Sequence, residues 1–267
     1  MLKDITIGQF FPGDSVIHRL DPRFKIVMTL IFIVMLFTGQ SMICLAVGAV
    51  YTLTAILLSK IKFRMFARSI KPLMPFLLIT ALLNIIFVSG GTVYFQWKFL
   101  RITSEGISVS IVMIIRIVML IAGSSLLTYT TSPITLTDAV ERLLSPLKKF
   151  RFPVHELAMM MSIALRFIPT LIEETDKIIS AQKARGAEID TGSIANRAKN
   201  LVSILVPLFI SAFRRADELA TAMECRCYCG GEGRTRLRQL KSAPRDYIAL
   251  AVTISFLACV IVINIIY

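Results

Sequence analysis

The chain has 267 residues, of which 55% are hydrophobic, and it carries a formal net charge of +13 at pH 7. A mean hydropathy of +0.73 together with this basic charge indicates a membrane protein with basic surface in water. A soluble nucleic-acid-binding protein does not fit, because no recognition motif of that class is present. We therefore expect the lipid bilayer as a partner, and no nucleic acid.

Apolar stretches long enough to cross a bilayer recur along the chain, each measured against a span of about twenty residues. The expected spans, in chain order, are 26–38 (with Phe24 and Lys25), 42–58, 72–88, 107–129 and 247–267. Between the third and fourth spans, the β-prone stretches 92–95 and 99–100 favour a small hairpin.

Lysine and arginine in the connecting segments predict the orientation, because cytoplasmic loops carry the excess of positive charge. The basic residues before the first span and between the second and third are Lys3, Arg19, Arg23, Lys25, Lys60, Lys62, Arg64, Arg68 and Lys71. The 89–106 link holds only Lys98 and Arg101. We expect a multi-pass protein with a cytoplasmic N-terminus, a cytoplasmic 130–246 region and an external C-terminus.

Arg116 lies in the middle of the fourth expected span. A central arginine costs on the order of 2.5–3.5 kcal/mol on insertion scales, so its side chain should face protein. One interpretation is a contact with another membrane subunit. The other is structural, a pair with a polar group or helix-end carbonyl within the bundle.

The 130–246 region predicts three helices. Thr130-Thr131-Ser132-Pro133 favours an N-cap before a helix with apolar residues over 136–147, and two long helices follow, at 155–185 and about 194–226. Pro169 and Pro207 lie inside the long helices and should bend them. The apolar middles, 157–172 and 201–213, could be extra spans, but their lengths favour amphipathic helices in the membrane interface.

Two arginines stand at the ends of these long helices, in Ala184-Arg185-Gly186 and in Cys225-Arg226-Cys227, about forty residues apart. A repeated arginine at a repeated helix tip indicates a partner with two similar sites. Ordinary C-terminal capping is the alternative, since a helix dipole favours a cation there and glycine takes the left-handed position.

The sequence offers no catalytic constellation and no metal site. Cys225, Cys227 and Cys229 are too closely spaced for a structural zinc site, which wants four ligands with wider pair spacing, so reduced thiols are expected. No phosphate-binding loop, Ser/His/Asp set or His-Glu-x-x-His motif occurs. We expect no catalytic residue and no cofactor in this chain, and any energy for transport should come from another chain.

The residues Ala164-Leu165-Arg166-Phe167-Ile168-Pro169, then Ala181-Gln182-Lys183-Ala184-Arg185-Gly186, and later Ala222-Met223-Glu224-Cys225-Arg226-Cys227, together resemble the transmembrane T component of energy-coupling factor (ECF) transporters of the bacterial cell membrane. The resemblance implies that both arginine motifs insert into grooves on two ABC-type ATPases, which bind ATP and Mg. It also implies a small membrane S component that captures a vitamin or other micronutrient. Cysteines flank Arg226 where the family more often has Ala and Gly.

The expected fold is an all-α membrane protein with about five transmembrane helices and a cytoplasmic or interfacial domain of long coupling helices. Its divisions are 1–129 for four spans, 130–242 for the coupling helices and 243–267 for the last span. The expected function is a non-catalytic scaffold that couples ATP hydrolysis to S-component reorientation, with a stand-alone carrier or channel as the alternative. Residues expected to serve structure or subunit contact are Arg116, Arg166, Pro169 and Pro207.

Overall fold

A computed structural model describes residues 10–39, 41–88, 90, 92–97, 100–150, 152–186, 194–230, 240 and 242–266. The chain forms two compact units. The bundle unit comprises Gly8–Leu136 with Leu240–Tyr267, and the long-helix unit comprises Thr137–Gln239 with Met1–Ile7. Lys3 and Lys98 lie outside the described residues.

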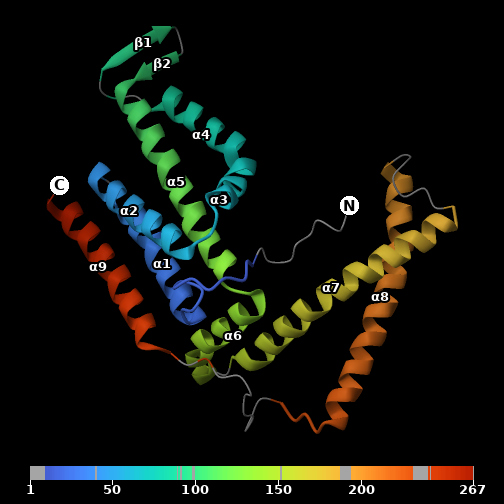
Figure 1. The fold of residues 1–267 in the computed structure, drawn as a ribbon. Helices are drawn as coiled ribbons and strands as arrows, with labels where there is room; N and C mark the ends of the chain where they lie inside the picture. The colour runs from blue at the N-terminus through green and yellow to red at the C-terminus, as the bar shows by residue number, and fades with distance from the viewer. Residues whose placement is uncertain are drawn as a thin grey trace. The chain divides into compact units, whose positions relative to one another are not determined.

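The bundle unit is built mainly of helices (Figure 1). Its elements are α1 (Pro22–Thr38), α2 (Met42–Ser59), α3 (Phe63–Ile70), the 3-10 turn η2 (Lys71–Leu73), α4 (Met74–Phe87), β1 (Val93–Trp97), β2 (Leu100–Thr103), α5 (Ser104–Thr130) and α9 (Pro244–Ile266). Polar caps start several of them. The side chains of Asp21, Ser41 and Thr103 accept backbone N–H bonds at the starts of α1, α2 and α5.

The core of the bundle lies where α1 meets α2, α5 and α9. Phe32 and Met35 of α1, Met119 of α5 and Val260 of α9 are buried there. Gly123 of α5 permits the close approach, since a Cβ at that position would lie 2.2 Å from the Phe32 ring. Many large apolar side chains on the outer faces are exposed, as expected for surfaces that meet lipid rather than water.

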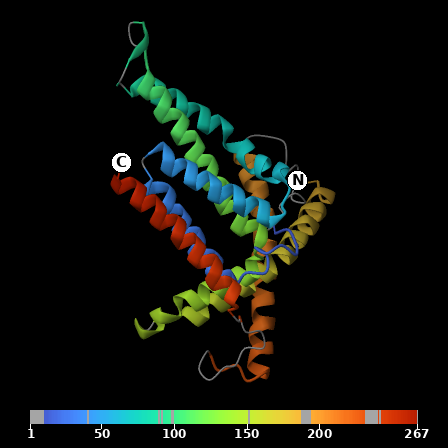
Figure 2. The same ribbon diagram turned by 60° about the vertical axis from the view of Figure 1, so that its left-hand side comes forward.

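The segment between α4 and α5 forms the hairpin that the sequence predicts. Strands β1 and β2 pair antiparallel, with Trp97 opposite Leu100 and Val93 opposite Thr103. Figure 2 shows this hairpin beyond the ends of α4 and α5. Among the described residues, the expectation of an all-α chain therefore holds apart from this two-stranded ribbon.

Five helical segments in the described chain are long and apolar enough to cross a membrane, namely Met42–Ser59, Phe63–Phe87, Ser104–Thr130, Val154–Ala184 and Pro244–Ile266. Four correspond to the expected second to fifth spans. The fifth is α7, whose apolar part the sequence assigned to the interface. The expected first span, α1, has 17 residues and a length of about 26 Å, at the lower end for a span. Because α1 packs along α5 and α9, we keep it as a member of the membrane bundle.

The long-helix unit consists of most of α6 (Pro133–Leu144), the 3-10 segment η3 (Ser145–Phe150), α7 (Val154–Ala184) and α8 (Ile194–Cys225). The described starts of these helices lie within three residues of the predicted ones. The Ser132 hydroxyl accepts the N–H of Thr135 at 3.4 Å, as an N-cap does. Glu141 of α6 lies 3.1 Å from His155 Nδ1 of α7. Both long helices run on through their prolines as single helices, so the bends at Pro169 and Pro207 stay predictions.

Candidate functional site

Helices α7 and α8 pack against each other in antiparallel directions. Gln182 of α7 donates to the Ser203 carbonyl of α8 at 3.2 Å. About two helical turns further from the tip of α7, Glu174 accepts hydrogen bonds from Ser211 and Arg215, each at 2.7 Å. Residue numbers fall along one helix as they rise along the other, which is the register of an antiparallel pair. The C-terminal ends of α7 and α8 therefore lie at opposite ends of the pair.

The carboxylate of Glu174 is the principal polar brace of this pair. Its two oxygens are used separately, Oε1 by the Ser211 hydroxyl and Oε2 by the Arg215 guanidinium. The Arg215 bond is also an ion pair between half-buried side chains, and such charge-assisted bonds are stronger than neutral ones. Glu173 and Glu174 are adjacent in the sequence, which gives no signal for which of the two acids would be used.

The first candidate arginine ends α7 in a well-formed cap. The Arg185 N–H donates to the carbonyls of Ala181 and Gln182, and the Gly186 N–H donates to Lys183 O at 3.0 Å. Gly186 has φ +85°, the left-handed conformation that glycine adopts without a steric cost. The predicted glycine cap is present in the structure.

The second candidate arginine ends α8 in the same way, although no glycine is present. Cys227 N–H donates to Glu224 O at 2.8 Å and Tyr228 N–H donates to Met223 O at 3.1 Å, the two bonds of a Schellman motif. Cys227 takes the left-handed position, with φ +55°. Arg226 thus occupies the position that Arg185 occupies in α7, one residue before the left-handed residue.

Backbone groups satisfy both caps, and the arginine side chains take no part in them. Arg185 and Arg226 are exposed, and neither guanidinium forms a hydrogen bond or ion pair with another described residue. Ala184, Gly186, Cys225 and Cys227 beside them are exposed as well. Each arginine is therefore an exposed cation flanked by small residues at the end of a helix.

The spacing of the two tips follows from the register of the pair. Extending the pairing of Gln182 with Ser203 to the tip of α7 sets Arg185 opposite residue 200, 26 residues before Arg226 on α8. At 1.5 Å per residue, the two arginines are separated by about 39 Å along the helix. A single compact site could not contact both tips at this separation.

The sequence matches a known protein family and several relatives over most of its length. The family described as "CbiQ: Cobalt transport protein" matches residues 13–237. A relative from Clostridium kluyveri, called energy-coupling factor transporter transmembrane protein EcfT, is 58% identical over 93% of both chains. EcfT proteins from Ruminiclostridium cellulolyticum and Lactococcus lactis are 49% and 42% identical, over 100% and 98% of both chains.

The chain belongs to the family of ECF transporter T components.

It is the transmembrane scaffold of such a transporter, as the sequence motifs predicted, and it has the multi-pass membrane architecture of its relatives.

The other expected site residues of this T component lie in different settings. Arg166 and Pro169 are exposed on α7, and Pro207 is half-buried within α8. Arg116, in the bundle unit, donates from Nη2 to the carbonyl of Gly39 at 2.6 Å, and Gly39 is the C-cap of α1. A helix-end carbonyl is the kind of partner that the structural interpretation of Arg116 requires.

Cys227 gives this T component a testable weak point. A non-glycine residue in the left-handed region costs roughly 1 kcal/mol or more. We expect Cys227→Gly to slow amide hydrogen exchange in the last turns of α8, and Cys227→Val to accelerate it, because a β-branched residue tolerates this conformation worst. Cys229→Gly is the control and should bring no protection. Equal exchange in the glycine and valine variants would contradict the assignment of strain to Cys227.

Proposed function

We propose that this T component couples ATP hydrolysis by two ABC-type ATPases to reorientation of a small membrane S component that captures a vitamin or other micronutrient. The observation that carries the proposal is the pair of exposed arginines at equivalent backbone positions, about 39 Å apart along α8. ATP and Mg would be bound by the ATPases, and this chain would supply neither cofactor nor catalytic residue.

The helix pair is suited to transmit a displacement. The brace of Glu174 with Ser211 and Arg215 ties α7 to α8 between the two tips. An ATPase that moves one tip would then move α7 and α8 together as one body, and the second tip would move with them. This is the mechanical part that we assign to the T component.

One face of α8 offers a surface for the S component. Large apolar side chains recur there at helical spacing and remain exposed, at Leu201, Val202, Leu205, Val206, Phe209, Ile210 and Phe213. The side chains of Gln182 and Glu174 on α7 meet α8 on other positions, at Ser203, Ser211 and Arg215. We propose that the apolar face packs against the S component at membrane depth.

A stand-alone carrier or channel gains no comparable support. Such a protein needs polar groups free to line a path across several spans. Arg116 of α5 and Lys25 of α1 are engaged instead, Arg116 with the Gly39 carbonyl and Lys25 with the Thr130 carbonyl at 3.0 Å.

Purification of the tagged chain from its native membrane in mild detergent tests the proposal directly. We expect two ATPase chains and one small membrane protein for each T component, measured by native mass spectrometry. The double variant of Arg185 and Arg226 serves as the matched control. A chain that purifies alone and still transports substrate in vesicles would support the carrier alternative.

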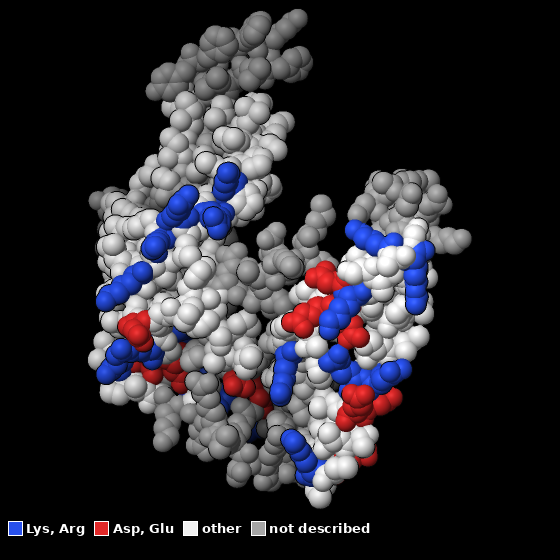
Figure 3. Space-filling view, turned by 45° about the vertical axis from the view of Figure 1, so that its right-hand side comes forward, with Lys and Arg blue, Asp and Glu red and all other residues white. Residues whose placement is uncertain are grey.

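We propose further that the N-terminus and the long-helix unit face the cytoplasm. The basic belt of Lys60, Lys62, Arg64, Arg68 and Lys71 is exposed, and Figure 3 shows a row of neighbouring Lys and Arg side chains on the bundle unit. In intact cells, a membrane-impermeant maleimide should label Thr92→Cys, whereas Cys225, Cys227 and Cys229 should react only after permeabilisation. Thr92 is exposed, and the unaltered chain is the control for native thiols. Labelling of Thr92→Cys from the cytoplasmic side alone would show that the orientation is opposite to the one proposed.

A further inference from the structure

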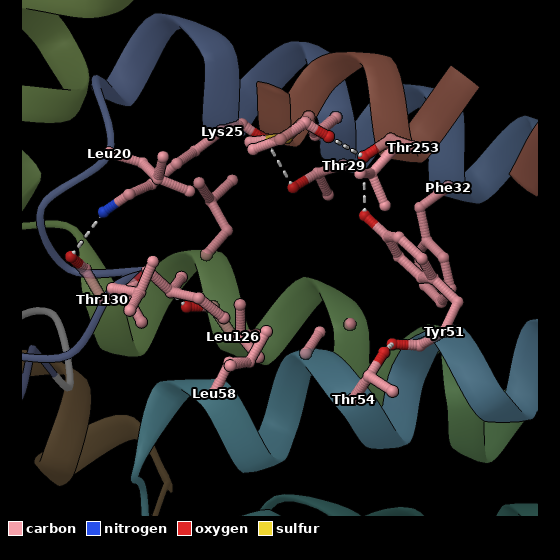
Figure 4. A pocket seen from close by; sticks show the side chains of 18 of the residues that line it. Leu20, Lys25, Thr29, Phe32, Tyr51, Thr54, Leu58, Leu126, Thr130 and Thr253 are labelled. Atoms are coloured by element: carbon pink, nitrogen blue, oxygen red, sulfur yellow. Dashed lines mark hydrogen bonds between the residues drawn. The ribbon is translucent and has the colours of Figure 1, made fainter. Parts of the chain in front are cut away.

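The bundle unit contains a cavity of about 410 Å³ between α1, α2, α5 and α9 (Figure 4). This volume lies within the range of sites that hold small organic ligands. The cavity is separate from both arginine tips, which belong to the long-helix unit. The coupling function therefore does not account for it.

The walls are apolar over a defined length. The lining residues of α9 extend over twelve residues, from Arg245 to Phe256, or about 16 Å along the helix. The hydrocarbon core of a bilayer is about 30 Å thick, so one leaflet is about 15 Å deep. The cavity thus has the length of one leaflet.

One end of the cavity is cationic. Lys25 is 5% exposed there, and its Nζ donates to Thr130 O at 3.0 Å and Thr131 Oγ1 at 3.2 Å. Arg245 lines the same cavity from the start of α9 and is exposed. Among the described residues that line the cavity, no aspartate or glutamate occurs.

The nearest carboxylates are already engaged by protein groups. Asp21 pairs with Arg23 at 2.7 Å, and Asp246 accepts the backbone N–H groups of Asp21 and Ala243. The side chain of Arg245 is exposed and forms no ion pair with a described residue, so its charge is available at the mouth for an anion from outside the chain.

The opposite end is closed by a hydrogen bond. The Tyr51 hydroxyl lies 3.0 Å from Thr253 Oγ1, and Phe32 stacks on the Tyr51 ring. Figure 4 shows Lys25 and Thr130 at one side of the cavity and Tyr51 with Thr253 at the other. The cavity is therefore charged at one end, apolar along its length and closed at the far end.

The rim is apolar and exposed. Val16, Leu58 and Ile248 line the cavity and are 58%, 54% and 64% exposed. An apolar rim on helices of the membrane bundle opens toward hydrocarbon rather than water, which favours a ligand that arrives through the bilayer.

We propose that this cavity binds one acyl chain of an anionic phospholipid. The chain lies along α9 toward the Tyr51–Thr253 bond, and the phosphate lies at Arg245. A lipid supplies both parts of the match, an apolar chain one leaflet long and a negative charge at the end where Arg245 and Lys25 lie. The occupant joins α9 to α1, α2 and α5 across a space that would otherwise be an unfilled cavity.

A photo-crosslinking experiment tests the site on the full-length chain. The protein is placed in phosphatidylcholine nanodiscs that contain phosphatidylglycerol with a diazirine in one acyl chain, and crosslinked peptides are identified by mass spectrometry. We expect crosslinks at Tyr51 and Phe256, which line the cavity, to exceed those at Leu30 and Leu78, which are exposed on outer faces. Equal labelling of both pairs would mean ordinary surrounding lipid and would overturn the proposal.

Filling the cavity with a larger side chain tests where the acyl chain binds. Ala249→Trp on α9 and Ala55→Phe on α2 should each abolish the excess labelling, and two variants on different helices protect against a folding failure in one. Ala251→Trp, an exposed α9 position that is not among the lining residues, is the matched control and should leave labelling unchanged. Unchanged labelling in monodisperse Ala249→Trp and Ala55→Phe proteins would contradict the site.

Removing the cation tests the headgroup. Arg245→Gln should weaken phosphatidylglycerol labelling about fivefold, the size expected for one Lys or Arg meeting an anionic lipid. Arg64→Gln removes the same charge outside the cavity and should have no effect on it. A phosphatidylcholine probe that labels the cavity as strongly as phosphatidylglycerol would overturn the assignment to an anionic lipid. A helix of a partner protein crosslinked in the cavity in place of lipid would overturn the proposal of a lipid site.

Discussion

Replacing both Arg185 and Arg226 by alanine is expected to abolish substrate uptake and to release or uncouple the ATPases. Arginine makes bidentate, charge-assisted bonds to carboxylates or helix-end carbonyls. Losing one such bond in a desolvated groove leaves the partner group unpaired, at a cost of roughly 2–5 kcal/mol. Because the two tips are about 39 Å apart along α8, each loss acts on a separate contact. ATPase co-purification and uptake, measured on the same membranes, report both effects.

Each single alanine variant should impair uptake and keep part of the assembly, since the other tip and the apolar flanks remain. Arg185→Lys and Arg226→Lys keep the charge but lose the planar fork, so they should recover little of the uptake. Arg214→Ala makes the same change at an exposed position of α8 and should behave as wild type. Wild-type uptake by the double variant would mean that both arginines are ordinary helix ends and that the proposed coupling role is wrong.

Reversing the charge of Glu174 should cost at least several-fold in uptake, because it places two cations where Oε2 of Glu174 now meets Arg215 at 2.7 Å. Like charges at this contact should open the crossing of α7 and α8 and let one tip move without the other. ATPase co-purification should persist in Glu174→Arg, because both arginine tips are intact. Loss of uptake with retained assembly is the signature of a broken brace.

A charge exchange provides the control. The double change Glu174→Arg with Arg215→Glu restores opposite charges and should recover part of the uptake that either single change loses. Glu173→Arg introduces the same cation at the neighbouring exposed position and should have a much smaller effect. Equal losses in the Glu173 and Glu174 variants, with no recovery in the exchange, would show that the crossing does not depend on this pair.

Most of the helical architecture could be predicted from the sequence, because apolar length and helical spacing are local properties. The caps at Ser132 and Gly186, the hairpin before α5 and four of the span-forming helices are confirmed. The same local properties could not show which of α1 and α7 is the remaining helix long and apolar enough to cross a membrane. Both combine apolar stretches with charge, and the α1 helix ends after 17 residues.

The contacts made across sequence distance could not be predicted. The sequence named a helix-end carbonyl as one possible partner of Arg116, but only the packing of α1 on α5 shows that it is the carbonyl of Gly39, 77 residues away. The selection of Glu174 over Glu173 depends on which face of α7 meets α8. The left-handed conformation of Cys227 could not be predicted from the residue type, because cysteine rarely adopts it.

The short first helix also has a consequence for the lipid around it. Lys25 meets the last residue of α5 and Gly39 meets Arg116, so α1 ends level with the middle of α5. Helix α5 has 27 residues and α1 has 17, a difference of about 15 Å in length. Bilayers adapt to a short helix by thinning beside it. Headgroups and water should therefore form a dimple over the turn between α1 and α2, where the guanidinium of Arg116 is hydrated more easily than it would be at the centre of a flat bilayer.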